Sequence, residues 1–203
     1  MSTIRTTLRQ SGVAVRAMLV FTLVLGIGYA LLITGIGQIA LPWQAGGSVV
    51  RSADGGVVGS ALLGQPFTDS GGAPLREYFQ SRPSAAGDGY DGGASSGSNL
   101  GPENADLVAA IQDRQAAIAA FEGVDVSEIP ADAVTASASG LDPHISPAYA
   151  QLQAARVAEA RGLPIDEVQS LVEEHTEARD LGYLGEPRVN VLSLNLAIDA
   201  PAG

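Results

Sequence analysis

The pattern of hydrophobic and polar positions divides the chain into two different parts. Residues 17–41 read AMLVFTLVLGIGYALLITGIGQIAL and contain no charged side chain. As a helix, this stretch spans about 37 Å, enough to cross a hydrocarbon core of about 30 Å with some tilt. The pattern therefore predicts a tail at 1–16, one transmembrane helix at 17–41 and one large domain at 42–203.

Helical periodicity recurs three times in the domain. Apolar residues follow a helical spacing over 104–121, 147–161 and 164–175, and a glycine follows each of the first two segments. The second begins at Ser146-Pro147, a hydroxyl for the N-cap and a proline for the first helical position. We expect three helices at these places.

Strand patterns are shorter. We expect short strands near 56–63 and 134–139, and a half-buried strand over 189–198, where leucine and isoleucine alternate with other residues. Residues 80–103 are rich in Gly and Ser and form an irregular stretch longer than most loops. Helices and strands interleave without βαβ repetition, so we predict an α+β fold for a single mixed α/β domain.

The charges around the apolar segment predict its orientation. Arg5, Arg9 and Arg16 precede it without any acidic residue, and basic residues beside a membrane helix stay on the cytoplasmic side. Trp43, just after the segment, suits the opposite interface. The expected localisation is a single-pass cell-membrane protein with a cytoplasmic N-terminus and an extracytoplasmic domain.

A cleaved signal peptide is the alternative reading of the same segment. Its apolar core would be about 7–15 residues long and would precede a small-x-small cleavage site. The present core is longer, and residues 37–41 make a poor cleavage site. The domain leaves the cytoplasm under either reading.

Small residues form a stripe along the predicted membrane helix. Gly26, Ala30 and Thr34 recur at four-residue spacing, and such a face lets another helix approach closely. The alternative is that glycine is simply common in membrane helices. We expect a partner helix at this face.

Composition narrows the possible partners. Eight of the 11 arginines lie beyond the apolar segment, together with all 22 acidic residues, which gives that part a formal charge of −14. Such a surface argues against nucleic acid and anionic lipid as partners, and it can concentrate cations or simply keep the domain soluble. Without cysteine the domain has no disulfide, and burial alone must hold it together.

The sequence argues against a catalytic site. The chain has no lysine for a phosphate-binding Walker loop, and its two histidines, His144 and His175, lack a metal-ligand pattern. Asp142, His144 and a serine could form a triad in principle, but the Asp-Pro-His segment is better read as a turn. We expect no catalytic residue and no metal site.

Four segments are more specific than ordinary loops. They are SRPSA at 81–85, GSNLGP at 97–102, SGLDPHISP at 139–147 and LGEPRVNVL at 184–192. In this order behind one N-terminal helix, they resemble the C subunit of the bacterial Kdp potassium-transporting P-type ATPase. The resemblance covers essentially the whole chain.

This resemblance implies a non-catalytic accessory subunit of a high-affinity, ATP-driven potassium importer. The implied partners are a channel-like potassium-binding subunit, a P-type ATPase subunit and a small one-helix subunit. The accessory subunit would stabilise the assembly and act as a chaperone-like factor for ATP binding by the ATPase subunit. It would carry no cofactor of its own: ATP acts through the complex, and potassium is the transported ion.

The resemblance also implies a nucleotide-binding stretch. The matching positions are Ser95, Ser96, Gly97, Ser98 and Asn99, with serine at 96 where the family pattern has glycine. ATP is cytoplasmic, whereas the arginine asymmetry places these residues on the other side of the membrane. If the predicted topology is right, residues 95–99 therefore cannot contact ATP directly.

Five loop residues are candidates for partner contact: Arg82, Asn99, Asp142, His144 and Arg188. Each also has a structural reading as a turn or loop residue. The accessory-subunit hypothesis places the acidic domain near the potassium entrance. A membrane-anchored exported binding module and a membrane-anchored hydrolase are the alternatives.

Overall fold

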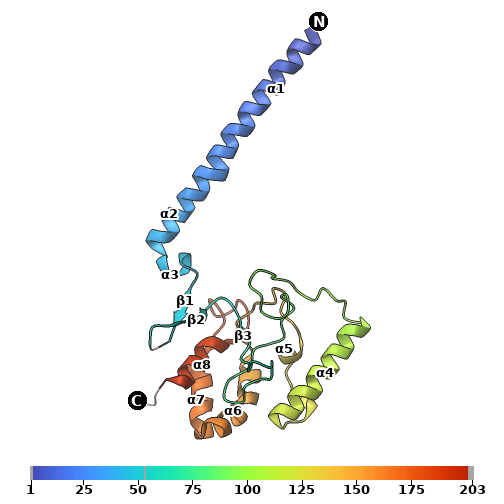
Figure 1. Cartoon of the computed structure of the whole chain (residues 1–203), viewed down its shortest axis with the longest axis vertical. Helices are drawn as coiled ribbons and strands as arrows, with labels where there is room; N and C mark the ends of the chain where they lie inside the picture. Colours follow the sequence, from blue (N-terminus) through green and yellow to red (C-terminus); the bar gives the residue numbers. More distant parts are fainter. Residues whose placement is uncertain (1, 53, 201–203) are drawn as a thin grey trace. The chain divides into compact units, whose positions relative to one another are not determined.

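The computed structural model of the chain describes residues 2–52 and 54–200 (Figure 1). The chain divides into two compact units, Met1–Ser48 and Val49–Gly203. The first is dominated by one long apolar helix, and the second combines helices with small sheets. The predicted fold class, an N-terminal apolar helix followed by a mixed α/β domain, is confirmed.

The first unit is almost entirely helical. Its elements are α1 (Ser2–Phe21), the π-helical segment η1 (Thr22–Tyr29), α2 (Ala30–Ala40) and the short α3 (Pro42–Ala45). The stretch Thr6–Ala40 is long and apolar enough to cross a membrane. The helix thus begins well before the apolar run at 17–41 and includes most of the tail.

The apolar side chains of this helix are exposed along its length. In water such a surface would be unfavourable, whereas lipid tails or another apolar helix would cover it. The π-helical turn falls in the segment that contains Gly26 and Gly28; π-helical turns are rare and frequent at functional sites. The helix ends at Ala40, just before Pro42.

The second unit contains the remaining elements. The strands are β1 (Val49–Arg51), β2 (Val57–Ser60), β3 (His144–Ile145), β4 (Thr176–Glu177) and β5 (Arg188–Asn190). The helices are α4 (Ala105–Glu122), the 3-10 turn η2 (Val126–Glu128), α5 (Ala131–Val134), α6 (Pro147–Arg161), α7 (Ile165–Glu174) and α8 (Val191–Asp199).

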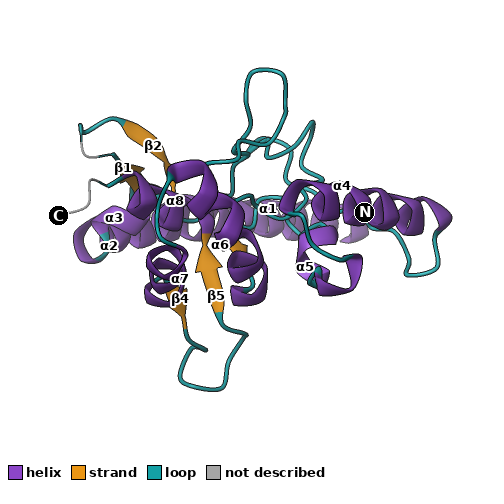
Figure 2. Ribbon diagram, turned by 90° about the horizontal axis from the view of Figure 1, so that it is seen from below, coloured by secondary structure: helices purple, strands orange, loops and turns teal. Residues whose placement is uncertain are grey.

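The strands form two small antiparallel sheets. β1 and β2 pair as a hairpin, and β5 lies between β3 and β4 in the second sheet. In this sheet Val189 stands opposite both Ile145 and Thr176. Figure 2 shows β4 and β5 side by side, joined by a long loop.

The three predicted helices are present, with the expected ends. The Asn104 side chain accepts hydrogen bonds from the first amides of α4, and Gly123 follows with a positive φ of 73°. Ser146 caps α6 in the same way, and Gly162 ends it at a φ of 66°. Local signals in the sequence are therefore enough to place these helices.

The strand predicted over 189–198 is wrong for most of its length. Only its first two residues belong to a strand, β5, and the rest forms helix α8. The Asn190 side chain accepts a hydrogen bond from the Ser193 amide and starts the helix. Val191 and Asn195, expected on the outer face of a strand, are both buried.

Of the other two strand predictions, one is wrong and one is confirmed over a shorter range. The strand predicted at 134–139 is absent: α5 ends at Val134, and an irregular segment follows. Asp132 of α5 accepts hydrogen bonds from the Ser146 amide and hydroxyl, which tie α5 to the start of α6. Near 56–63 a strand is present as predicted, but it covers only Val57–Ser60 and pairs with β1, a strand that the sequence pattern did not predict.

The core of the second unit forms around α6. Ala150, Ala154 and Val157 on this helix have no exposed surface, and small side chains let neighbouring elements approach closely. α6 packs most extensively against α7, whose Val168 and Val172 are fully buried. Helix α8 and the ring of Phe79 complete the core.

An extended segment crosses this core without belonging to a sheet. The backbone of Phe79 forms two hydrogen bonds with the Asn195 side chain, at 2.8 and 3.0 Å. The backbone of Gln80 does the same with the Gln153 side chain, at 2.7 and 3.1 Å. We call these two pairs the amide clamp. The two side-chain amides thus satisfy the backbone N–H and C=O groups of this buried segment, which would otherwise need a neighbouring strand.

A buried ion pair lies beside the amide clamp. Arg156 Nε donates to Glu122 Oε2 at 2.8 Å, and both side chains are only 1% exposed. The remaining contacts of this guanidinium are with the carbonyls of Arg76 and Tyr78, the Gln153 side chain and the Phe121 ring. Arg156 therefore joins α4, α6 and the segment leading to Phe79.

Candidate functional site

Three of the specific segments found in the sequence meet on one surface. The Ser84 hydroxyl donates to the carbonyl of Gly140 at 2.5 Å. The Ser95 hydroxyl and the Ser96 amide both donate to the carbonyl of Ser139, at 2.9 and 3.0 Å. The Gly/Ser-rich stretch at 80–103 is therefore pinned to the SGLDPHISP segment.

Two glycines make this junction possible. Gly140 has a φ of +69°, and a Cβ there would lie 2.6 Å from the Ser96 carbonyl oxygen and 2.7 Å from the Ala86 amide nitrogen. A Cβ at Gly97 would lie 2.9 Å from the carbonyl oxygen of Ala138. Backbone thus packs directly on backbone at both places, which only glycine permits.

Tyr90 holds the loop from inside. Its hydroxyl donates to the Arg82 carbonyl, and its amide donates to the Ser84 hydroxyl at 2.8 Å. Burial raises the pKa of Tyr90 to about 12, so the phenol stays protonated and keeps donating at neutral pH. Sequence reasoning did not single out this residue, although it is the only aromatic residue in 80–103.

Arg82, Asp142 and His144 form a connected polar cluster. Arg82 Nη1 lies 3.1 Å from Asp142 Oδ2, and His144 Nδ1 lies 3.2 Å from Asp142 Oδ1. Burial alone would raise the pKa of Asp142, but hydrogen bonds from the His144 ring and amide, together with the Arg82 charge, lower it below its ordinary value. Asp142 is therefore held as a carboxylate.

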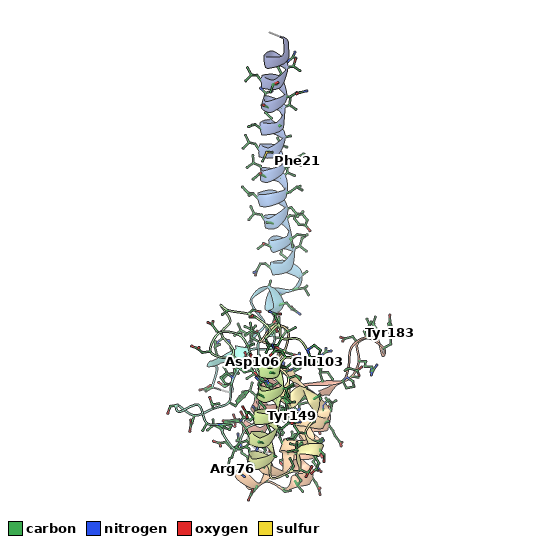
Figure 3. The ribbon with its side chains drawn as sticks, turned by 90° about the vertical axis from the view of Figure 1, so that its right-hand side faces the viewer. Phe21, Arg76, Glu103, Asp106, Tyr149 and Tyr183 are labelled. Carbon is green, nitrogen blue, oxygen red and sulfur yellow. The ribbon has the colours of Figure 1, made fainter. Side chains whose placement is uncertain are left out.

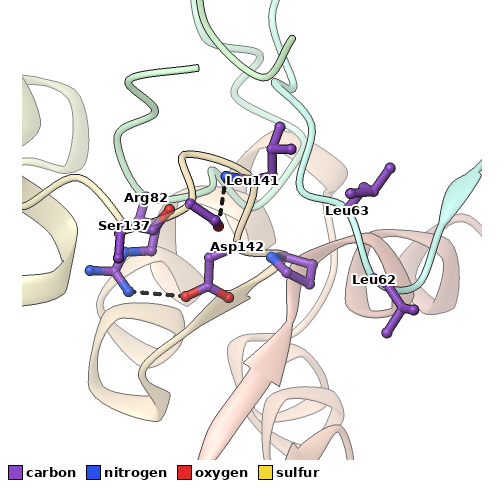
Figure 4. Close-up of a pocket in the computed structure, with 9 residues that line it drawn as sticks. Leu62, Leu63, Arg82, Ser137, Leu141 and Asp142 are labelled. Atoms are coloured by element: carbon purple, nitrogen blue, oxygen red, sulfur yellow. Dashed lines mark hydrogen bonds and ion pairs between the residues drawn. The ribbon is translucent and has the colours of Figure 1, made fainter. Parts of the chain in front are cut away.

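Two open hollows flank this cluster. The first has a volume of about 590 Å³ and is lined mainly by Leu62, Leu63, Leu141 and neighbouring residues, with Arg82 and Asp142 beside them (Figure 4). The second also has about 590 Å³; its lining includes Arg82, Asp142, His144, Pro187 and Arg188. Arg82 and Asp142 border both hollows, so they stand at the centre of one continuous surface.

Four of the five candidate contact residues thus converge, although they span 82–188 in the sequence. Arg188 reaches the second hollow from β5, where it pairs with Glu177 at 2.9 Å and Asp180 at 3.3 Å. The fifth candidate, Asn99, lies in an exposed turn at a φ of +53° and lines neither hollow.

The candidates on the apolar helix belong to the other unit. Gly26 lies in η1, and Ala30 and Thr34 lie in α2. The Thr34 hydroxyl donates to the Ala30 carbonyl at 2.8 Å, so it is satisfied within its own helix. The stripe is exposed, and its side chains are small enough for a neighbouring helix to approach closely.

Comparison with known proteins identifies the family. The family described as K+-transporting ATPase, c chain, matches residues 11–200. The Potassium-transporting ATPase KdpC subunit of Beijerinckia indica is 54% identical over 184 residues, covering 91% of this chain and 90% of that protein. The subunits of the same name from Caulobacter vibrioides and Kineococcus radiotolerans are 54% and 51% identical, over 92% and 96% of this chain and 91% and 95% of theirs.

The chain belongs to the KdpC family. The resemblance noted from the four segments is therefore confirmed. KdpC is an accessory subunit of the potassium-transporting ATPase complex rather than its catalytic subunit. One N-terminal helix that is apolar enough to span a membrane is consistent with a membrane-anchored member of this family.

The polar cluster of this KdpC member is not arranged as a catalytic triad. Asp142 contacts His144, but the nearby Ser146 hydroxyl donates to Asp132 at 2.8 Å instead. The Asp142 carboxylate is also engaged by Arg82. Among residues 2–52 and 54–200, no group of three or more His, Asp or Glu side chains could hold a metal ion.

The stretch matched to the nucleotide-binding positions of the KdpC family is attached to a neighbouring loop by its first residues. Ser95 and Ser96 hydrogen-bond to Ser139, and Gly97 packs on Ala138. The four polar residues of the stretch, Ser95, Ser96, Ser98 and Asn99, are all exposed. A phosphate cradle needs several amides that point to one open position, whereas the first residues of this stretch serve to attach the loop.

Proposed function

We propose that this chain stabilises the assembled potassium-transporting ATPase by docking one defined surface on a neighbouring subunit. This motif surface consists of residues 62–63, 81–85, 95–99 and 137–144, together with Arg188. The observation that carries the proposal is that these specific segments converge near two open hollows. The exposed side chains of Leu62 and Leu63 lie there beside the half-buried ion pair of Arg82 and Asp142. Such a combination of apolar contact and fixed polar groups is typical of an interface.

Leu62 and Leu63 support a docking role. They are 61% and 44% exposed and line the first hollow beside Arg82 and Asp142. The backbone beneath them is fixed, because the Gly64 amide donates to the Leu141 carbonyl at 2.8 Å. A partner that covered these side chains would gain apolar burial without first ordering the loop.

The apolar helix provides the second contact in this proposal. Its small-residue stripe of Gly26, Ala30 and Thr34 would pack against a helix of the channel-like potassium-binding subunit. The three arginines of the 1–16 tail would stay in the cytoplasm, so the acidic domain would face outward. There its formal charge of −14 would raise the local concentration of potassium near the entrance. The P-type ATPase subunit and the small one-helix subunit would complete the complex.

An effect on ATP binding would be indirect. Residues 95–99 contain no basic side chain, and the outward topology would separate them from cytoplasmic ATP. We propose that the chain acts as a chaperone-like factor by holding the transmembrane subunits in the arrangement in which the ATPase subunit binds ATP. The matched positions Ser95–Asn99 would then contribute through assembly.

The test compares two surface substitutions in the tagged full chain. Leu62→Asp places a charge on the motif surface, and Val126→Asp places one on an exposed apolar residue of η2 that lines neither hollow. We expect Leu62→Asp to lower the recovery of the ATPase subunit from solubilised membranes by about tenfold or more, and to raise the KM for ATP of what remains. The control should leave both unchanged. Equal recovery for the two variants would refute docking through this surface.

A further inference from the structure

The connection between β4 and β5 is a hairpin with an apolar tip. Asp180 and Leu184 exchange two backbone hydrogen bonds of 2.9 Å, which close a three-residue tip of Leu181, Gly182 and Tyr183. We call residues 178–187 the finger. Figure 3 shows Tyr183 at the end of this hairpin, projecting away from the rest of the second unit.

The tip is unusually apolar for its exposure. Leu181 is 81% and Tyr183 is 70% exposed, the highest values among the large hydrophobic residues described in the second unit. Leu184 is 49% exposed. Three large apolar side chains on one protruding turn give nothing to the core, and clustered exposed apolar residues mark sites of interaction.

The backbone of Leu181 adds a second observation. Its φ is +54°, a conformation that a leucine adopts only at a cost and that glycine or asparagine would accept readily. Residues kept in sparsely populated conformations cluster at functional positions. A leucine at this place is understandable if its side chain makes a contact outside the chain.

Ion pairs hold the base of the finger. Arg188 contacts Glu177 at 2.9 Å and Asp180 at 3.3 Å, and Arg179 contacts Glu186. These pairs cross-link the two arms below the tip. An exposed ion pair adds little stability by itself, but several together fix the geometry of the arms. A finger ordered in advance loses less conformational freedom on binding.

Charge indicates what the tip contacts. The finger base carries three acids against two arginines, on a segment of the chain with a formal charge of −14. An anionic bilayer and a second copy of the same acidic domain would both repel it. A multi-subunit complex, to which the family belongs, offers another surface. The return arm of the finger also borders the motif surface, since Glu186, Pro187 and Arg188 line the second hollow.

We propose that the finger inserts Leu181, Tyr183 and Leu184 into a nonpolar socket, rimmed by basic groups, on another subunit of the potassium-transporting ATPase. This inference rests on the proposed function, because it names a contact within the assembled complex. The socket buries the three side chains, and the basic rim complements the finger base, which carries one more acid than arginine.

The first experiment measures assembly of the complex. The tagged full chain carries Leu181→Asn and Tyr183→Ser, which remove the apolar tip while asparagine suits the positive φ at 181. The control is Ile165→Ser, an apolar residue of α7 that is 40% exposed. We expect the finger variant to retain at least tenfold less of the other subunits per tagged chain after washing, and the control to retain the wild-type amount.

A photo-reactive phenylalanine analogue at position 183 identifies the contact. The expected product joins position 183 to another subunit of the complex, and the same analogue at position 165 gives none. Cross-links only to phospholipid or to a second copy of this chain would overturn the proposal. So would wild-type retention by the finger variant while wild-type chain co-purifies with its partners. Recovery of the wild-type chain without any partner would instead overturn the proposed function.

Discussion

Replacing Arg156 by methionine tests the reasoning about the buried ion pair. Methionine fills much of the same volume but leaves the Glu122 carboxylate buried without its partner. Breaking a buried pair in this way costs about 3–5 kcal/mol. The carbonyls of Arg76 and Tyr78 also lose the guanidinium donor, which adds about 1–3 kcal/mol. We therefore expect Arg156→Met to lower the free energy of unfolding by about 4–8 kcal/mol.

Two further variants separate the contributions. Arg156→Lys keeps the charge but loses the forked donor geometry, so about 1–3 kcal/mol should be lost. Arg156→Met combined with Glu122→Leu removes both charges, and buried pairs replaced by apolar residues are often neutral in stability. The double variant should recover most of the loss and stay about 1–3 kcal/mol below wild type because of the two carbonyls.

The pH dependence supplies an independent check. Burial raises the pKa of Glu122, although Arg156 offsets part of this effect. A raised carboxyl pKa favours folding below the ordinary value of 4.5, and this gain disappears as pH rises through the folded pKa. Without Arg156 the rise should be larger. The deficit of Arg156→Met relative to wild type should therefore grow between acid and neutral pH.

The assay is urea unfolding of the full chain in detergent micelles, followed by circular dichroism at several pH values. If Arg156→Met does not fold, the lysine variant and the double variant still give the comparison. The reasoning fails if Arg156→Met loses less than about 2 kcal/mol, or if the double variant is no more stable than the single one.

Two other predictions concern the motif surface. The lowered pKa of Asp142 means that its carboxylate stabilises the fold above 3.8 and that this contribution is lost as pH falls through the folded pKa. The difference in urea midpoint between wild type and Asp142→Asn should therefore shrink on acidification; a difference independent of pH would contradict this. Gly140→Ala should cost more than about 2 kcal/mol, because a left-handed alanine costs about 1–2 kcal/mol before any clash with the Ser96 carbonyl. Gly162→Ala, at a φ of +66° with nothing within 4 Å, is its control and should show only the backbone cost; equal losses would refute the steric argument.

Local signals in the sequence predict the helices well. Asn104 and Ser146 are side-chain caps, and the glycines that follow the helices take the left-handed conformation, so each end is fixed by a few neighbouring residues. The segment 189–198 is different because its leucines satisfy both a strand and a helix period. The Asn190 cap and the burial of Asn195 decide for the helix, and the second depends on Phe79, 116 positions away.

The motif surface shows the same limit. The specific segments can be recognised one by one, but Arg82 and Asp142 are 60 positions apart and meet only through the folded core. Tyr90 belongs to none of these segments, and it holds the loop through its burial and its hydrogen bond to the Arg82 carbonyl. Periodicity and spacing describe neighbours along the chain, and they cannot predict which loops the core brings together.

The amide clamp has a consequence for the order in which the protein is made. Phe79 leaves the ribosome 116 residues before Asn195, its partner. At about 5–20 residues per second, the segment waits about 6–23 seconds for that side chain. During this time only the Gln80–Gln153 half of the amide clamp can form. The clamp beneath the loop that follows Phe79 is therefore complete only when helix α8 has been made.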